Sequence, residues 1–132
     1  MTRIDCETER AGETAQILHV RAHTLHADLL VEEGSADAAP GAHDYFDASL
    51  AACKAMTATW YARRKGIPLE RVETHVERDD TDERKGIYHL RVRAVVHGPL
   101  TDEQRADLHR AIARCPVHKL MTTADVQIEM IE

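Results

Sequence analysis

Two cysteines far apart in the sequence have the residue type and the setting for chemistry. Cys53 lies inside the apolar run YFDASLAACKAMTATWY, and Cys115 comes directly before a proline in ARCPVH. A cysteine thiolate is a nucleophile and a redox centre, whereas a buried neutral thiol acts as a small hydrophobic residue. The sequence leaves both interpretations open for each residue. The third cysteine, Cys6, lies in a polar strand candidate near the N-terminus, and we interpret it as incidental.

Cys115 occupies a predicted break between two helical segments. Pro116 follows it, and proline is favoured in the first turn of a new helix because the N–H it lacks would be unpaired there anyway. A thiol at such a break faces free backbone N–H groups and the positive end of a helix dipole, both of which lower the pKa of a thiol. We therefore expect thiolate character at Cys115, although a plain junction residue is the alternative interpretation.

The first third of the chain predicts two short strands, QILHVRA (16–22) and TLHADLLVEE (24–33), in which polar and apolar residues alternate. A tight turn at Ala22 and His23 would join them. A loop containing glycine and proline follows and ends at Asp44, a candidate helix N-cap.

The segment from Tyr45 to about Lys65 contains no proline or glycine and predicts a long helix that stops at Gly66. Small residues cover much of its circumference, so other elements could approach it on several sides. We therefore expect a central, largely buried helix. Its larger apolar residues recur at helical spacings: Phe46, Leu50, Cys53, Met56 and Trp60.

The second half of the chain predicts a β-hairpin, a second helix that begins at Thr101, and a final strand. The segments are RVETHVERDD and GIYHLRVRAVVHG for the hairpin, TDEQRADLHRAIARC for the helix, PVHKLMTT for a short turn, and ADVQIEMI for the strand. This order of elements predicts an α+β fold, and the length predicts one domain over residues 1–132.

Composition excludes several classes of protein. The chain is 43% hydrophobic and 30% charged, and no apolar stretch approaches the roughly 20 residues that cross a bilayer. Its net charge is −6 and its basic residues are dispersed, so we expect no nucleic-acid partner. The polar N-terminus predicts a cytoplasmic protein. The nine histidines are scattered without metal-ligand spacing, so we expect neither a metal nor another cofactor.

Three motifs together resemble a known family. FDASLAAC, ARRKGIPL and, after a charged hairpin, CPVHKL are similar to the OsmC/Ohr family of cysteine-dependent hydroperoxide reductases, from about Pro40 onward. The resemblance implies an intertwined homodimer with an OsmC-like fold. It also implies that Cys53 is the peroxidatic cysteine, that Cys115 resolves it as a disulfide, and that the partners are an organic hydroperoxide and an external dithiol.

The chain departs from this family where the peroxidatic thiolate should be activated. Active members carry a proline–glutamate pair ahead of the helix and an arginine in an early strand, and Ala42 and His43 stand where the pair would align. Arg21 is our candidate for the arginine, and the candidates for rebuilding the network are His43, Asp44 and Asp47. As alternatives, the acids are helix-capping residues and the histidine is a loop residue.

The residues Tyr45, Phe46, Met56 and Trp60 could form an apolar wall that favours organic over hydrogen peroxide, or they could be core.

A disulfide between Cys53 and Cys115 needs their two Cα atoms within about 7 Å. For that bond to form, the break before Pro116 must lie against the middle of the long helix. The alternative function is a non-catalytic OsmC-like dimer that binds a small apolar ligand and has structural cysteines.

Overall fold

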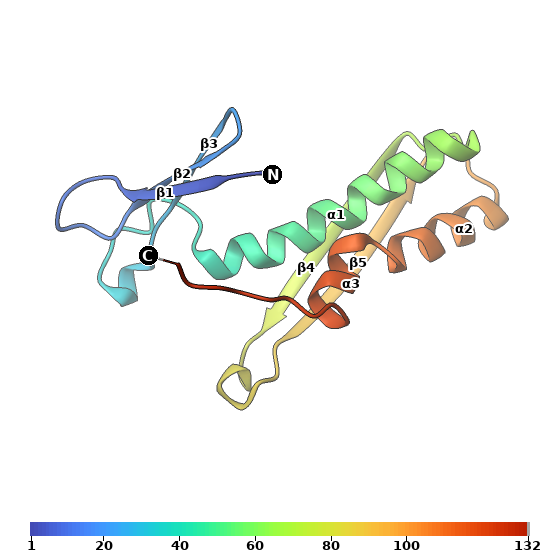
Figure 1. The fold of residues 1–132 in the computed structure, drawn as a ribbon. Helices are drawn as coiled ribbons and strands as arrows, with labels where there is room; N and C mark the ends of the chain where they lie inside the picture. Colours follow the sequence, from blue (N-terminus) through green and yellow to red (C-terminus); the bar gives the residue numbers. More distant parts are fainter. Residues whose placement is uncertain (132) are drawn as a thin grey trace. The chain divides into compact units, whose positions relative to one another are not determined.

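The computed structural model of the protein describes residues 1–131 and has an α+β fold (Figure 1). The chain forms two compact units, Met1–Phe46 and Asp47–Glu132, which we describe separately. The strands are β1 (Ile4–Thr8), β2 (Gln16–Val20), β3 (His23–Ala27), β4 (Arg71–Asp79) and β5 (His89–His97). The helices are α1 (Ala42–Lys65), α2 (Asp102–Ala113) and α3 (Pro116–Thr122), with 3₁₀ turns η1 (Val31–Glu33) and η2 (Glu83–Lys85).

The first unit is built on a three-stranded antiparallel sheet with β2 in the centre. The expected strand over 16–22 ends early, because Arg21 and Ala22 form the turn that joins β2 to β3. We had predicted that Arg21 lies in a strand, and this was wrong. Its φ is 55°, and it lies in the turn. The second strand also ends early, at Ala27, because the next residue anchors a loop.

That loop is organised by the carboxylate of Asp28, a buried residue that is only 6% exposed. It accepts hydrogen bonds from Ser35 Oγ at 2.6 Å, Thr14 Oγ1 at 2.9 Å, and the backbone N–H groups of Leu29 and Ala38 at 2.8 and 3.1 Å. These donors, led by Ser35, hold the pKa of Asp28 well below its usual range, because they stabilise the charged form.

We expect Asp28→Asn to lower the free energy of unfolding at pH 7. A folded-state pKa below the unfolded value of about 3.9 stabilises the fold above that pH, and the gain is lost as the pH falls toward the folded-state value. Urea unfolding at pH 7 and pH 3 should therefore show a difference between wild type and variant that shrinks at the lower pH. Asp37→Asn, an exposed position in the same loop, is the control; an equal loss in the control would contradict the prediction.

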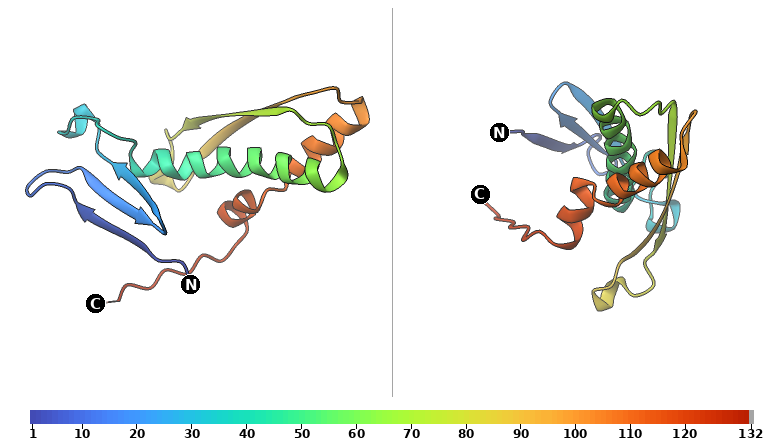
Figure 2. Two further views of the ribbon diagram at one scale, coloured as in Figure 1. Left: turned by 90° about the horizontal axis from the view of Figure 1, so that it is seen from above. Right: turned by 90° about the vertical axis from the view of Figure 1, so that its right-hand side faces the viewer.

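In the second unit, α1 lies along the β4–β5 hairpin, as both views of Figure 2 show. Thr74 Oγ1 donates to the Ala51 carbonyl of α1 at 2.9 Å. The Asp47 carboxylate accepts from Arg78 Nε at 2.6 Å and from the Tyr88 hydroxyl at 2.8 Å. The hairpin and the second helix were predicted correctly. The core joins both helices to β5 and consists of Ala58, Ala62, Val96, Leu108 and Ile112.

The helix α1 begins earlier than predicted and is less buried. Asp44 is not its N-cap but lies in its first turn, where its carboxylate accepts the Gly41 N–H at 2.9 Å. The predicted stop is confirmed by Gly66, whose φ is 65°. Among the described residues, α1 fully buries one stripe, along which Ala58 and Ala62 pack on β5 and α2 and Lys54 contacts α2 and α3. The buried residues are Leu50, Lys54, Ala58 and Ala62.

The C-terminal predictions were wrong in two places. Residues 116–122 form a helix, α3, and not a simple turn, and residues 124–131 have no regular secondary structure. Alternation of apolar residues makes a strand only where a neighbouring strand supplies hydrogen bonds. The apolar side chains of this segment are exposed instead, as Ile128 at 83% and Met130 at 91% show.

Candidate active site

Cys53 and Cys115 lie on facing elements of the second unit. Cys53 is in the middle of α1, and Cys115 is the residue before α3, with extended backbone at φ −60° and ψ 146°. The Val117 N–H, in the first turn of α3, donates to the Cys53 sulfur at 3.5 Å. The break before Pro116 therefore lies against the middle of α1, as a disulfide between these cysteines requires. In this structure all three cysteines are free thiols.

The two thiols differ in their surroundings. Cys115 is fully buried, whereas Cys53 is half-buried and also lies 3.9 Å from Thr57 Oγ1. Burial raises the pKa of Cys115, and its contact with Cys53 adds to the rise, while the backbone N–H of His118 and the charge of Lys54 oppose it. Our expectation of a lowered pKa was therefore wrong, because the loss of water around Cys115 outweighs the nearby N–H groups.

Lys54 is a site residue that the sequence analysis missed. It is only 4% exposed, and its ammonium donates to the Ile112 carbonyl at 3.0 Å and lies 3.1 Å from His118 Nδ1. A signal was present, because Lys54 is four residues from both Leu50 and Ala58 and so shares their helical face. A lysine in an apolar stripe indicates a buried cation with specific partners.

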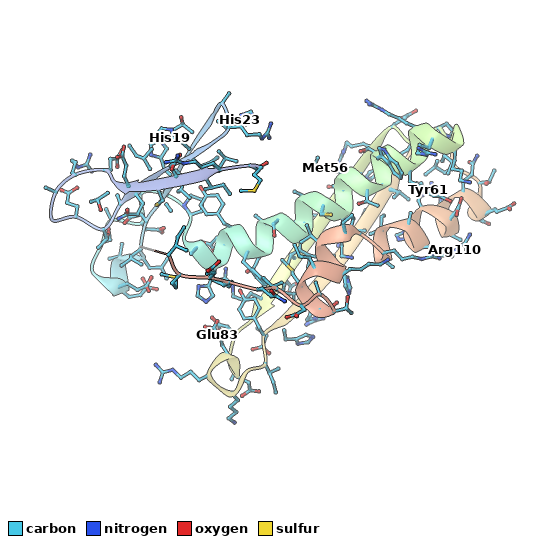
Figure 3. All side chains as sticks on the ribbon, viewed as in Figure 1. His19, His23, Met56, Tyr61, Glu83 and Arg110 are labelled. Atoms are coloured by element: carbon cyan, nitrogen blue, oxygen red, sulfur yellow. The ribbon has the colours of Figure 1, made fainter. Side chains whose placement is uncertain are left out.

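A cavity of about 930 Å³ opens beside Cys53. Met56 and Trp60 of α1 form part of its wall. Arg110 of α2 and Arg114, which caps α2, bring positive charge to it, and Asp107 brings a negative charge that pairs with Arg110. Figure 3 shows Met56 and Tyr61 on α1 and Arg110 on α2. The cavity is lined by Ser49, Ala52, Cys53, Met56, Thr57, Trp60, Tyr61, Asp107, Arg110, Ala111, Arg114, Pro116 and Val117.

Two residues predicted for the apolar wall, Tyr45 and Phe46, are not among these lining residues. The Tyr45 hydroxyl donates instead to the backbone carbonyl of His26, within the first unit. Phe46 is the last residue of that unit, and 46% of it is exposed. The structure therefore brings Met56 and Trp60 to the cysteine, and it gives Tyr45 a tethering contact.

The predicted activating residues are distributed over both units. The described hydrogen bonds of Asp47 go to Arg78 and Tyr88, so its carboxylate joins α1 to the hairpin and does not contact Cys53. Arg21 and His43 belong to the first unit, whereas both cysteines belong to the second, and an activating role for these two residues stays a prediction.

Residues 1–131 contain no cluster of three or more His, Cys, Asp or Glu side chains arranged to hold a metal ion. Over the same residues, no helix has the length and apolar character to span a membrane.

Comparison with solved structures shows the same fold in three bacterial proteins. An OsmC-like protein from Mycoplasma pneumoniae has a TM-score of 0.72 at 18% identity, over 94% of this chain and 89% of that one. An organic hydroperoxide resistance protein OsmC from Legionella pneumophila has a TM-score of 0.62 at 22% identity, over 93% and 90%. The organic hydroperoxide resistance protein OhrB of Bacillus subtilis has a TM-score of 0.59 at 19% identity, over 93% and 91%.

No curated protein matches the sequence. The OsmC-like protein family matches residues 32–130, which include both cysteines and parts of both compact units. This confirms the resemblance drawn from the FDASLAAC and CPVHKL motifs: the chain belongs to the OsmC-like family.

Proposed function

We propose that the protein is a thiol peroxidase that reduces organic hydroperoxides. The observation that carries the proposal is the position of Cys53. It lines the cavity, and its sulfur accepts a hydrogen bond from Val117, two residues after Cys115. Cys53 is half-buried, so a substrate in the cavity could reach its thiol. Cys115 is buried, which suits a thiol that reacts only with the oxidised Cys53. Relatives in the family with the same fold are named as organic hydroperoxide resistance proteins.

The reaction follows from thiol chemistry. The Cys53 thiolate attacks one peroxide oxygen, the O–O bond breaks, and the alkoxide leaves and takes a proton to become an alcohol. Cys53 is then a sulfenic acid. The Cys115 sulfur attacks it, the S–O bond breaks, and hydroxide leaves and becomes water as the disulfide forms. An external dithiol restores both thiols by exchange. Because this regeneration requires a reducing compartment, we propose that the protein acts in the cytoplasm.

The lining of the cavity supports an organic substrate. Met56, Trp60 and Val117 offer apolar surface beside Cys53, and an alkyl or aryl group gains free energy by leaving water for such a surface. Hydrogen peroxide has no such group. We therefore propose that organic hydroperoxides are the better substrates.

We propose further that the working form is a homodimer. Met56 and Trp60 are 67% and 59% exposed in the single chain although they flank the cavity. Large exposed apolar side chains gathered in one place are typical of an interface. A sedimenting mass of 14.8 kDa at micromolar concentration would contradict a dimer.

Stopped-flow mixing with one equivalent of cumene hydroperoxide tests the function. We expect the loss of two thiols per chain, and peptide mapping should show a bond between Cys53 and Cys115 with Cys6 still reduced. Hydrogen peroxide at the same concentration is expected to react more slowly. Unchanged thiols after mixing would contradict the peroxidase.

The second candidate is a non-catalytic ligand-binding protein. It is favoured by the described hydrogen-bond partners of the Cys53 sulfur, a backbone N–H and a hydroxyl, neither of which carries a charge. If peroxide leaves the thiols intact, titration with an apolar fluorescent probe would test it. Binding that competes with alkylation of Cys53 would support this alternative, and failure to bind would contradict it.

A further inference from the structure

Lys54 is a buried cation beside Cys53, and it has no role in the peroxidase steps described above. Removing an ammonium group from water is unfavourable unless hydrogen bonds replace the lost hydration. Lys54 meets this cost with two partners from different helices, the Ile112 carbonyl of α2 and His118 Nδ1 of α3. A stripe position that needed only packing would be filled at less cost by leucine or alanine, as at Leu50 and Ala58.

The first partner connects Lys54 to the backbone of the resolving cysteine. The Ile112 carbonyl lies in the last turn of α2 and accepts the Cys115 N–H at 3.3 Å as well as the Lys54 ammonium at 3.0 Å. The carbonyl end of a helix is the negative end of its dipole, where a lysine is stabilising. Lys54 therefore joins α1 to the carbonyl that orients Cys115.

The second partner lies on the other side of the same cysteine. His118 is in the first turn of α3, and its Nδ1 is 3.1 Å from the Lys54 ammonium. An ammonium has no lone pair, so Lys54 donates and Nδ1 accepts, which leaves the proton of a neutral ring on Nε2. The lysine thus contacts both segments that flank Cys115.

We propose that Lys54 positions Cys115 against Cys53 and supplies the positive charge that supports the Cys115 thiolate in the resolving step. This inference rests on the proposed peroxidase function and assigns a residue to its second stage. The Cys115 thiolate attacks the Cys53 sulfenic sulfur, the S–O bond breaks, and hydroxide departs and takes up a proton to become water.

Three groups act on Cys115 besides burial: Cys53 and Lys54 from α1 and His118 from α3. Burial and Cys53 raise the pKa of Cys115, whereas the Lys54 charge and the His118 backbone N–H lower it. Without Lys54, less thiolate is present at neutral pH and the disulfide forms more slowly. The first stage, attack of Cys53 on peroxide, does not need the Cys115 thiolate.

A direct test measures Cys115 without any peroxide. In Cys6→Ser/Cys53→Ser protein, the ¹³Cβ chemical shift of labelled Cys115 is followed against pH with Lys54, Lys54→Met or Lys54→Arg. We expect Lys54→Met to move the midpoint to higher pH and to lower the thiolate fraction at neutral pH about three- to tenfold, since tenfold corresponds to one pKa unit. Lys54→Arg, which keeps the charge, should restore most of it. An unchanged midpoint in Lys54→Met would overturn the proposal.

A single-turnover experiment then examines the resolving step. In protein that retains Cys53 and Cys115, wild type and Lys54→Met are each mixed with one equivalent of cumene hydroperoxide, and the lifetime of the sulfenic acid is measured from the end of peroxide consumption. The sulfenic acid, trapped with dimedone, should persist about three- to tenfold longer, in proportion to the lost thiolate. An equal sulfenic-acid lifetime in both proteins would overturn the role of Lys54. If wild type consumes no peroxide, the proposed function fails while the titration still decides whether Lys54 controls Cys115.

The exposed His118 supplies a second variant if Lys54→Met does not fold. His118→Ala removes one acceptor and leaves the charge present but less firmly held. The titration midpoint of Cys115 should move in the same direction as in Lys54→Met but by a smaller amount. Leu120→Ala, an exposed position of α3 two residues beyond His118 and so on another face of the helix, should leave it unchanged. No movement in His118→Ala would count against the proposal.

Discussion

Cys53→Ser is expected to abolish peroxide consumption and sulfenic-acid trapping together, whereas Cys115→Ser should still consume one equivalent of peroxide and then stop. Loss of a nucleophile lowers turnover by a factor on the order of 10³ or more. Loss of the resolving thiol leaves the first step intact, because Cys53 keeps its place beside the cavity. Cumene hydroperoxide consumption and dimedone labelling of each variant, at stoichiometric peroxide, measure the two outcomes.

The exposed Cys6 is the matched control for this pair. Cys6→Ser should keep full turnover and still form the internal disulfide. Equal residual activity in Cys53→Ser and Cys115→Ser would contradict the division of labour between the two thiols. Rapid labelling of Cys115 in the Cys53→Ser protein would contradict it as well, because it would show that the buried thiol reacts directly with peroxide.

Leu108→Ala is expected to lower the free energy of unfolding by about 2–5 kcal/mol. Leu108 is fully buried where α2 packs on Ala58 and Ala62 of α1 and on Val96 of β5, so truncation leaves a cavity at the junction of three elements. The same packing holds α2, and with it the approach to Cys115. Urea unfolding followed by Trp60 fluorescence, at one fixed protein concentration, measures the loss.

Leu120→Ala is the control for Leu108→Ala, because Leu120 is 54% exposed on α3. It should change the free energy of unfolding by less than about 0.5 kcal/mol. A loss in Leu108→Ala no larger than in the control would mean that the α1–α2–β5 cluster is not the core of the second unit.

Elements with strong local signals were predictable. The hairpin was read from two alternating segments around a charged turn, and the structure pairs them from Arg71 with His97 to Asp79 with His89. The start of α2 followed from Thr101, whose hydroxyl accepts the Gln104 N–H at 3.1 Å while the Gln104 side chain accepts the Thr101 N–H. These interactions join residues close in sequence, so they can be inferred without the fold.

Elements that depend on distant partners were not predictable. The apolar alternation of residues 124–131 is indistinguishable from that of β5, yet only β5 has a strand beside it. The periodicity of α1 likewise places Leu50 and Met56 among its apolar residues, but the fold leaves only 5% of Leu50 exposed and 67% of Met56. Which of several apolar residues is buried depends on what packs against the helix.

By itself the sequence determined the family, the α+β order of elements and the two cysteines, because motifs and local periodicity are properties of the chain. Only the tertiary structure decided the environment of those cysteines. It buried Cys115 deeply enough to raise the pKa of its thiol despite its place at a helix start, and it brought Lys54 to the carbonyl and the histidine on either side of it. The reason is physical: a pKa is a balance between lost hydration and nearby charge, and both come from residues that are distant in sequence.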